Sequence, residues 1–204
     1  MTADMTPGSS SPAARLRSVI NANHGTWRGL VRTGLAQGEF ALGRIDPFLQ
    51  LPAQVQRLVF VCLGNINRSA FADQVARSLG VHSCSIGLST STGAPATPLA
   101  RQTAPGFGID LATHRATDLT DYRHQPGDLL LAMEVRHAHR LAARGLPAGS
   151  VALLGHWAAP HRIHLHDPHT LSPAYFRTCF TLIDSAVHGL VRNLRDADHP
   201  CVRT

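Results

Sequence analysis

From Arg57 onward, short apolar runs alternate with amphipathic helical segments, and this alternation restricts the fold more than any other feature. The apolar runs are RLVFVC, HSCSIG, DLLLAM and SVALLG, at residues 57–62, 82–87, 128–133 and 150–155. Helical periodicity is expected in residues 68–80, 96–104, 134–145 and 173–195. Strands that alternate with helices form a parallel sheet covered on both faces. The pattern predicts an α/β three-layer sandwich with a central four-stranded parallel sheet flanked by helices, plus an N-terminal extension.

The first 56 residues lack this alternation and are predicted to be the extension. Residues 1–14 are rich in Ser, Pro, Gly and Ala, which predicts disorder. Residues 15–56 carry short helical patches interrupted by glycines, so this remainder is predicted to be partly helical. We expect it to dock on the main domain, residues 57–200. The alternative is that it presents an amphipathic basic surface to a partner or a membrane.

The charge of the chain favours anionic substrates over nucleic acid. All 19 basic residues are arginine, and the formal net charge is +6. The arginines are scattered singly rather than clustered, and aromatic residues make up 5% of the chain, which leaves few platforms for stacking bases. We therefore expect the charge to attract small or protein-borne anions.

The cysteines and histidines predict neither disulfides nor a metal site. No apolar run is long enough for a signal peptide or a transmembrane helix, so a cytoplasmic location with reduced cysteines is expected. Zinc sites commonly pair cysteines within four residues, and Cys62, Cys84, Cys179 and Cys201 are not so paired. The histidine-rich stretch GHWAAPHRIHLHDPHT has no second cluster to complete a site. No metal or other cofactor is predicted.

The segment CLGNINR, residues 62–68, joins the first predicted strand to the first predicted helix of the domain. In parallel sheets, ligands bind beyond the carboxyl ends of the strands, which is where Cys62 is expected. Successive backbone N–H groups in such a loop can form an anion nest, and the following helix directs its positive end at the same point. Arg68 can add a two-pronged donor, and these charges favour the Cys62 thiolate. We interpret the loop as a phosphate-binding loop with a nucleophile; the alternative is a structural cysteine at a strand end.

These residues resemble the low-molecular-weight protein tyrosine phosphatase family. The family signature V-C-x-G-N-x-C-R-S-P corresponds to VCLGNINRSA at residues 61–70. The similarity continues through SIGLSTSTGAPATPLA, GIDLATHRATDL, DLLLAMEVRHAHRL and HDPHT, and covers roughly residues 57 to 197. HDPHT lies where the family has its Asp-Pro loop.

The resemblance implies a cysteine-dependent phosphomonoester hydrolase, with a phosphorylated protein or a small phosphomonoester as substrate. Cys62 would attack phosphorus and form a phosphocysteine. Asp167 would protonate the leaving oxygen and then activate water. The catalytic residues are thus Cys62, Arg68 and Asp167. The predicted phosphate-binding residues are Leu63, Gly64, Asn65, Ile66, Asn67, Arg68 and Ser69, with the Ser69 hydroxyl also donating to the sulfur.

The sequence departs from the family pattern at the loop and at the expected pocket wall. Asn67 replaces the loop's second cysteine, which in the family can form a protective disulfide with the nucleophile. The family often has aromatic residues that sandwich a phosphotyrosine ring; the corresponding positions here are Ser91 and His169-Thr170. These changes leave phosphotyrosine as one substrate class among several.

Two other functions are compatible with the loop. An arsenate reductase shares this fold, but it needs two further cysteines that relay a disulfide outward. A phosphate- or phosphoprotein-binding module without turnover is the third interpretation, with the extension as its interaction arm. Cys84 follows the loop too early to match the usual downstream pair of cysteines, and Cys179 is expected to be buried, which disfavours the reductase. Cys62, Arg68, Ser69 and Asp167 together disfavour a module without turnover.

Overall fold

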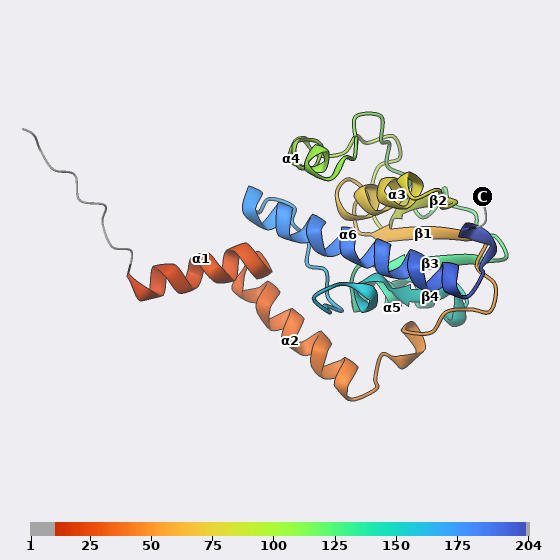
Figure 1. Ribbon diagram of the computed structural model, residues 1–204, viewed down its shortest axis with the longest axis horizontal. Helices are drawn as coiled ribbons and strands as arrows, with labels where there is room; N and C mark the ends of the chain where they lie inside the picture. Colours follow the sequence, from red (N-terminus) through yellow and green to blue (C-terminus); the bar gives the residue numbers. More distant parts are fainter. Residues whose placement is uncertain (1–10, 203–204) are drawn as a thin grey trace, which may run out of the picture.

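A computed structural model describes residues 11–202 of the chain (Figure 1). The strands are β1 (Arg57–Cys62), β2 (Ser83–Gly87), β3 (Asp128–Ala132) and β4 (Val151–Leu153). The α-helices are α1 (Pro12–His24), α2 (Trp27–Ala41), α3 (Arg68–Ser78), α4 (Pro98–Thr103), α5 (Val135–Ala143) and α6 (Pro173–Asp196). Short 3-10 helices are η1 (Asp46–Phe48), η2 (Ala104–Phe107), η3 (Ala148–Ser150), η4 (Leu154–Trp157) and η5 (Pro200–Val202).

The four strands form one parallel sheet in the order β2-β1-β3-β4. In β1, residues 58–62 are all buried, as expected for a strand in the middle of a sheet with both faces covered. Cys62 aligns with Gly87 of β2, and Val61 aligns with Ala132 of β3. The predicted fold class is therefore confirmed, and the carboxyl ends of β1 and β3 meet where Cys62 lies.

Alternate residues of the strands feed two hydrophobic clusters, one on each face of the sheet. Leu58 and Phe60 of β1 pack into the cluster that includes α3 and α6. Val59 and Val61 pack into the cluster on the opposite face, with α5 and parts of the extension. Figure 1 shows the same layering, with α3 and α6 on one side of the sheet and α5 on the other. This period-two alternation places helices on both faces and gives the three layers.

The helix α6 is the longest element and supports the helix that follows the candidate loop. Ser172 caps it by accepting a hydrogen bond from the backbone N–H of Tyr175, and Pro173 occupies its first position. The ring of Phe180 on α6 stacks on Phe71 of α3, with centroids 4.0 Å apart and planes 10° apart. Since α3 begins at Arg68, this contact helps to hold the loop against the sheet.

The extension forms two helices and corrects part of the expected disorder. Of the predicted disordered segment 1–14, residues 1–10 lie outside the described residues, whereas residues 12–14 are the first turn of α1. The Ser11 side chain caps this helix, and Gly25, with φ of 76°, ends it. Gly29, Gly34 and Gly38, at which interruptions were expected, lie inside α2. Within residues 11–202 no helix is long and apolar enough to cross a membrane.

One face of the extension contacts the domain. Ala36, Ile45 and Phe48 are buried in the same cluster as Val59 and Val61. Two hydrogen bonds from the domain reach the carbonyl oxygens of the α1 C-terminal turn. They run from Thr178 Oγ1 to Ala22, at 2.7 Å, and from Arg162 Nη1 to Asn23, at 2.6 Å.

Replacing Phe180 with alanine is expected to destabilise the protein by about 3–5 kcal/mol, because it leaves a cavity under Phe71 and removes a stacked pair. Denaturant unfolding measures the change. The control is Thr181→Ala, which alters the next, exposed residue of α6 and should change stability by less than about 0.5 kcal/mol. Equal effects of the two substitutions would contradict the packing described.

Candidate active site

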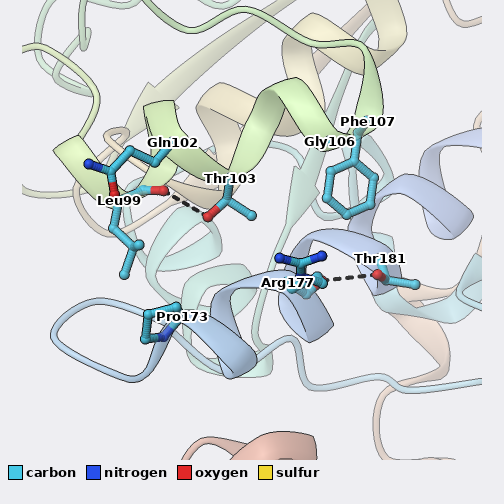
Figure 2. Close-up of a pocket in the computed structure, with 8 residues that line it drawn as sticks. All are labelled: Leu99, Gln102, Thr103, Gly106, Phe107, Pro173, Arg177 and Thr181. Carbon is cyan, nitrogen blue, oxygen red and sulfur yellow. Dashed lines mark hydrogen bonds between the residues drawn. The ribbon is translucent and has the colours of Figure 1, made fainter.

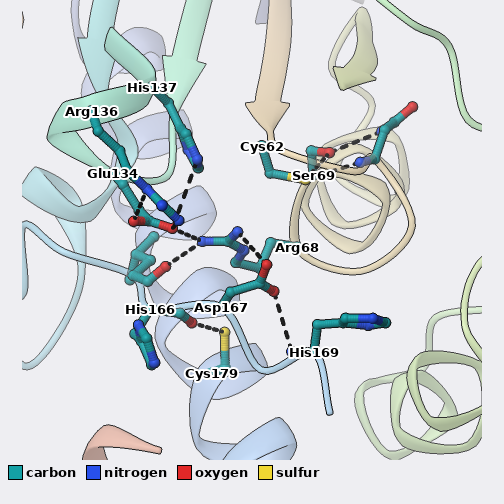
Figure 3. Close-up of polar contacts among 12 residues, drawn as sticks. Cys62, Arg68, Ser69, Glu134, Arg136, His137, His166, Asp167, His169 and Cys179 are labelled. Carbon is teal, nitrogen blue, oxygen red and sulfur yellow. Dashed lines mark hydrogen bonds and ion pairs between the residues drawn. The ribbon is translucent and has the colours of Figure 1, made fainter. Parts of the chain in front are cut away.

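The loop of residues 62–68 connects the end of β1 to the start of α3 and lines a small cavity of about 210 Å³. Figure 3 shows Cys62 and Ser69 at this loop, with Arg68 and Asp167 nearby. The residues around the cavity are Cys62, Leu63, Gly64, Ile66, Asn67, Ser89, Asp167 and His169. The fold thus brings the predicted nucleophile and the predicted general acid, 105 positions apart in the sequence, to one cavity.

The carbonyl groups of the loop point outward. Three of them accept from the neighbouring backbone: the N–H groups of Leu88, Ser89 and Thr97 donate to Cys62, Leu63 and Ile66, at 2.9–3.1 Å. When successive carbonyls are bonded on the outside of a loop, the N–H groups between them are turned to its inside. The loop therefore has the polarity of an anion nest.

Asn65 holds the loop in shape. Its φ is 50°, in the left-handed region that asparagine tolerates better than most residues, and it is fully buried. Its side-chain oxygen accepts from the backbone N–H of Thr117 at 2.8 Å, and its amide nitrogen donates to Ser69 Oγ at 2.9 Å. Its carbonyl lies 2.6 Å from His114 Nε2. A carbonyl only accepts, so His114 carries its hydrogen on Nε2.

The Cys62 sulfur lies 3.0 Å from Ser69 Oγ and accepts from the backbone N–H of Asn65 at 3.2 Å. The Ser69 oxygen accepts a hydrogen bond from the Asn65 amide, and its own hydrogen has two acceptors within reach, the sulfur at 3.0 Å and the Ile86 carbonyl oxygen at 3.5 Å. A thiolate can only accept hydrogen bonds, so both contacts suit the ionised form.

Arg68 is fully buried, and its guanidinium is divided between two tasks. Nη1 donates to Glu134 Oε1 at 2.6 Å and to the Leu165 carbonyl at 2.8 Å. Nε and Nη2 have no hydrogen-bond acceptor among the described residues, although Nη2 lies 3.0 Å from Asp167 Oδ2. Nε and Nη2 form one edge of the guanidinium, the edge that matches two oxygens of a phosphoryl group. Burial alone would lower the pKa of Arg68, but the Asp167 and Glu134 carboxylates outweigh burial and raise it.

Glu134 was missed as a site residue by the sequence analysis. It lies two residues after the end of β3, is completely buried, and binds Arg68 and also Arg136, whose Nε lies 2.7 Å from Oε2. Burial would raise the pKa of Glu134, but the charge of Arg68 and the hydrogen bond from Arg136 hold it well below its usual range. The signal in the sequence was an acidic residue directly after a buried strand, at the sheet edge where Cys62 was expected.

Two buried histidines flank Glu134 and are neutral. His137 Nε2 and His164 Nε2 each lie 3.7 Å from a Glu134 oxygen. Burial is the main cause that lowers the pKa of His137 to about 3, and the positive charge of Arg68 is the second cause. Burial also lowers the pKa of His164 to about 4, in spite of the nearby carboxylate. Arg68 and Arg136 are therefore the charges that balance Glu134 at neutral pH.

The predicted pocket wall is only partly present. His169 lines the cavity, and its backbone N–H donates to Asp167 Oδ1 at 3.2 Å. Ser91 and Thr170 are exposed and do not line the cavity, whereas Ser89, which the sequence analysis did not select, does. The cavity has no aromatic ring apart from the imidazole of His169.

The other cysteines are free and differ from Cys62 in their setting. Burial raises the pKa of Cys84 to about 11, of Cys179 to about 12 and of Cys201 to about 11. A disulfide relay needs thiols that ionise readily, because the thiolate is the attacking form. A raised pKa makes each of these three thiols harder to ionise. Among residues 11–202 no group of three or more His, Cys, Asp or Glu side chains is arranged to hold a metal ion.

A larger hollow of about 500 Å³ lies between α4 and α6 (Figure 2). Arg177 is its only charged residue, and no cysteine or carboxylate faces it. Of these two cavities, the one at Cys62 is lined by a thiol and a carboxylate.

The fold and the loop together define a class, that of small α/β phosphatases with a Cys-x5-Arg loop. The chain belongs to the low molecular weight phosphotyrosine protein phosphatase family, whose model matches residues 57–199. A similar protein, described as a probable low molecular weight protein-tyrosine-phosphatase EpsP from Ralstonia solanacearum, is 31% identical over 144 residues, which cover 69% of this chain and 97% of that protein.

Solved structures have the same fold. Vibrio vulnificus Wzb in complex with benzylphosphonate is 26% identical, with a TM-score of 0.60 over 68% of this chain and 99% of that one. The YwlE arginine phosphatase from Geobacillus stearothermophilus is 23% identical, with a TM-score of 0.60 over 69% of this chain and 94% of that one. The matched share of this chain corresponds to the part after the extension, and the chain covers nearly the whole length of each relative.

The lowered pKa of His137 predicts a specific acid instability. Below about pH 6.5 the unfolded chain protonates this histidine while the native state does not, so native stability falls as the pH drops toward 3. His137→Leu removes this proton uptake and is expected to reduce the stability loss between pH 7 and pH 4 by roughly 2–3 kcal/mol. Urea unfolding at several pH values measures it. His139→Leu, at an exposed position of the same helix, should keep the wild-type pH dependence.

Proposed function

We propose that the protein is a cysteine-dependent phosphomonoester hydrolase that acts through a phosphocysteine intermediate, with protein phosphotyrosine as its leading substrate class. The observation that carries this proposal is the juxtaposition of Cys62, the free edge of Arg68 and Asp167 around one cavity. Membership of the phosphatase family supports it. The reaction needs no cofactor. The required thiolate suits a reducing compartment, and we propose the cytoplasm.

In the proposed first step, the Cys62 thiolate attacks phosphorus and the bond from phosphorus to the leaving oxygen breaks. The loop N–H groups and the Nε/Nη2 edge of Arg68 hold the three equatorial oxygens, whose charge they stabilise in the transition state. The Ser69 hydroxyl donates a hydrogen bond to the Cys62 sulfur. This bond stabilises the sulfur as the nucleophile in the first step and as the leaving group in the second. Glu134 acts as a positioning residue, because it occupies Nη1 and so turns the other edge toward the cavity.

Asp167 is the proposed general acid and base. Its carboxyl group is partly exposed at the cavity, 29% by side chain, and so has access to a leaving oxygen and to water. It protonates the leaving alkoxide or phenoxide in the first step. In the second step it takes a proton from the water that attacks the phosphocysteine, which releases inorganic phosphate and the thiolate.

The shape of the cavity bears on the substrate. A cavity of about 210 Å³ without an aromatic wall accommodates the phosphoryl group but gives a phenol ring little stacking surface. Affinity for isolated phosphotyrosine should therefore be low. In a protein substrate, contacts from the surface around the phosphotyrosine would supply the remaining binding affinity. Because one fold relative is an arginine phosphatase, a substrate panel should include phosphoarginine beside phosphotyrosine, phosphoserine and a sugar phosphate.

Hydrolysis of para-nitrophenyl phosphate and phenyl phosphate tests the mechanism. Cys62→Ser is expected to abolish turnover and retain phosphate binding. Asp167→Asn should lower kcat/KM for phenyl phosphate by about 10²–10⁴-fold, and less for the nitrophenyl ester, whose leaving group needs little protonation. If the unaltered protein turns over no faster than Cys62→Ser, the proposed function is wrong and the protein is a binding module.

Asn67 predicts a response to oxidation. Its side-chain oxygen accepts from Thr97 Oγ1 at 2.5 Å, in place of the thiol that the family pattern has there. Peroxide should therefore carry Cys62 past the sulfenic acid to states that dithiothreitol does not reverse. Asn67→Cys is expected to make most of the lost activity recoverable with dithiothreitol. Full thiol recovery in a variant that keeps Asn67 and has the other three cysteines replaced by serine would contradict the prediction.

A further inference from the structure

The outer face of the extension carries all of the large apolar side chains that are exposed within residues 11–202. They are Leu16, Val19, Trp27, Val31, Leu35 and Leu42, between 44% and 69% exposed. Isolated exposed apolar residues need no explanation, but six within 27 positions, and none on the described part of the domain, are a concentration in the extension. On α2, Trp27, Val31 and Leu35 follow each other at intervals of four and so share one face of the helix.

This face is free because the opposite face of α2 is occupied. Gly29 and Ala36 are buried against the domain, and the ring of Phe40 lies 4.9 Å from that of His161. Leu35 and Arg32 lie at the edge of the outer face, because they also line a hollow of about 310 Å³ between α2 and the domain.

The charge around most of the outer face is positive. Residues 11–38 contain four arginines and no acidic residue, and Glu39, one helical turn after Leu35, is the first acidic side chain. Arg28 and Arg32 directly follow Trp27 and Val31 and are exposed. Arg17 also borders, with Ile20, Asn21 and Trp27, a surface hollow of about 420 Å³ at the elbow between α1 and α2. Figure 1 shows this elbow beside the first turns of α6, with α1 at the edge of the molecule.

We propose that this outer face binds the surface of an anionic phospholipid bilayer. Arginines beside exposed Trp, Leu and Val are the composition of helices that lie in the headgroup region, where the apolar side chains enter the acyl boundary and the cations meet anionic lipids. A second copy of the chain would bring like charges, Arg17, Arg28 and Arg32, to the contact.

Vesicle sedimentation and Trp27 fluorescence test the proposal on the full chain. Trp157→Phe leaves Trp27 as the single tryptophan, and its emission should shift to the blue with phosphatidylcholine vesicles that contain about one-third phosphatidylglycerol. Partitioning to these vesicles should be at least about tenfold stronger than to pure phosphatidylcholine and should weaken with salt.

Substitutions on the outer face separate the two contributions. Arg17→Gln/Arg28→Gln should weaken binding about 30-fold, and Val31→Ser/Leu35→Ser should remove the partitioning that persists at high salt. The control Arg101→Gln/Arg144→Gln removes the same charge from exposed positions of the domain. It should weaken vesicle binding much less than Arg17→Gln/Arg28→Gln does. Absence of binding to the anionic vesicles overturns the proposal. So does a dimer in sedimentation equilibrium that Val31→Ser/Leu35→Ser abolishes, because the face would then be a subunit interface.

The inner face of the extension supports a second, independent inference. The histidine-rich segment that leads to Asp167 lies against this face. Phe40 contacts His161, Gln37 Nε2 donates to the His161 carbonyl at 3.2 Å, and Arg162 donates to Asn23. A Cβ atom at Gly29 would lie 2.0 Å from the His24 carbonyl oxygen and 2.9 Å from the ring of His166, so the backbone of α2 touches the residue next to Asp167.

We infer that the extension positions the Asp167 loop for proton transfer, an inference that rests on the proposed function. The segment has no regular secondary structure between η4 and α6, and Asp167 itself contacts the domain mainly through Arg68. Residues 161, 162 and 166 each contact the extension, which limits the freedom of the loop from the side opposite the cavity. The extension is thus a positioning element, and its residues do not touch the reacting atoms.

Gly29→Ala tests this inference because its methyl group forces α2 away from the elbow and His166. The matched control is Gly34→Ala on the same helix, where a Cβ atom meets nothing within 4 Å. In Gly29→Ala, kcat/KM for phenyl phosphate should fall at least about tenfold more than for para-nitrophenyl phosphate, as expected when protonation of the leaving group is impaired. The inhibition constant of inorganic phosphate should stay within about twofold, because the anion nest is unchanged.

The outcomes distinguish this inference from the proposed function. An active Gly29→Ala protein with the wild-type ratio of the two esters overturns the inference alone. A proportional loss on both esters overturns it as well, since that result indicates general damage. If the unaltered protein hydrolyses neither ester, the proposed function is wrong and the inference fails with it.

Discussion

The buried ion pair between Arg68 and Glu134 is the interaction on which the site depends. It joins the loop after β1 to the segment after β3, at a point where neither side chain reaches water. An isolated charge there would be strongly destabilising, so each partner requires the other. The pair fixes Nη1 and leaves the Nε/Nη2 edge of Arg68 without a hydrogen-bond acceptor among the described residues. The edge proposed to bind phosphate is therefore oriented by a contact on the opposite side of the guanidinium.

The histidines behind the site have a different role from the one their number suggests. His137 and His164 are buried beside Glu134, and burial keeps them neutral. His161 and His166 instead lie against the extension. A histidine-rich sequence can thus be a packing surface, because imidazole combines a flat ring with polar atoms at its edge.

The extension has two faces with different physical demands. Its inner face is buried on the domain, with Ala36 and Phe48 in the core cluster beneath the sheet. Its outer face is apolar and basic, and the packing of the domain leaves it exposed. The family model matches residues 57–199, so the extension lies outside the part of the chain that the family model describes.

The sequence by itself determined the strand–helix order, the parallel sheet and the position of Cys62 at a strand end, because the apolar periodicity and the Cys-x5-Arg spacing are local properties. It also indicated Asp167, through resemblance to a family. Only the tertiary structure decided that Glu134 holds Arg68, that Ser89 rather than Ser91 lines the cavity, and that α2 touches the Asp167 segment. These contacts join residues that are far apart in the chain, and no local pattern specifies which buried charges meet or which edge of a side chain stays free.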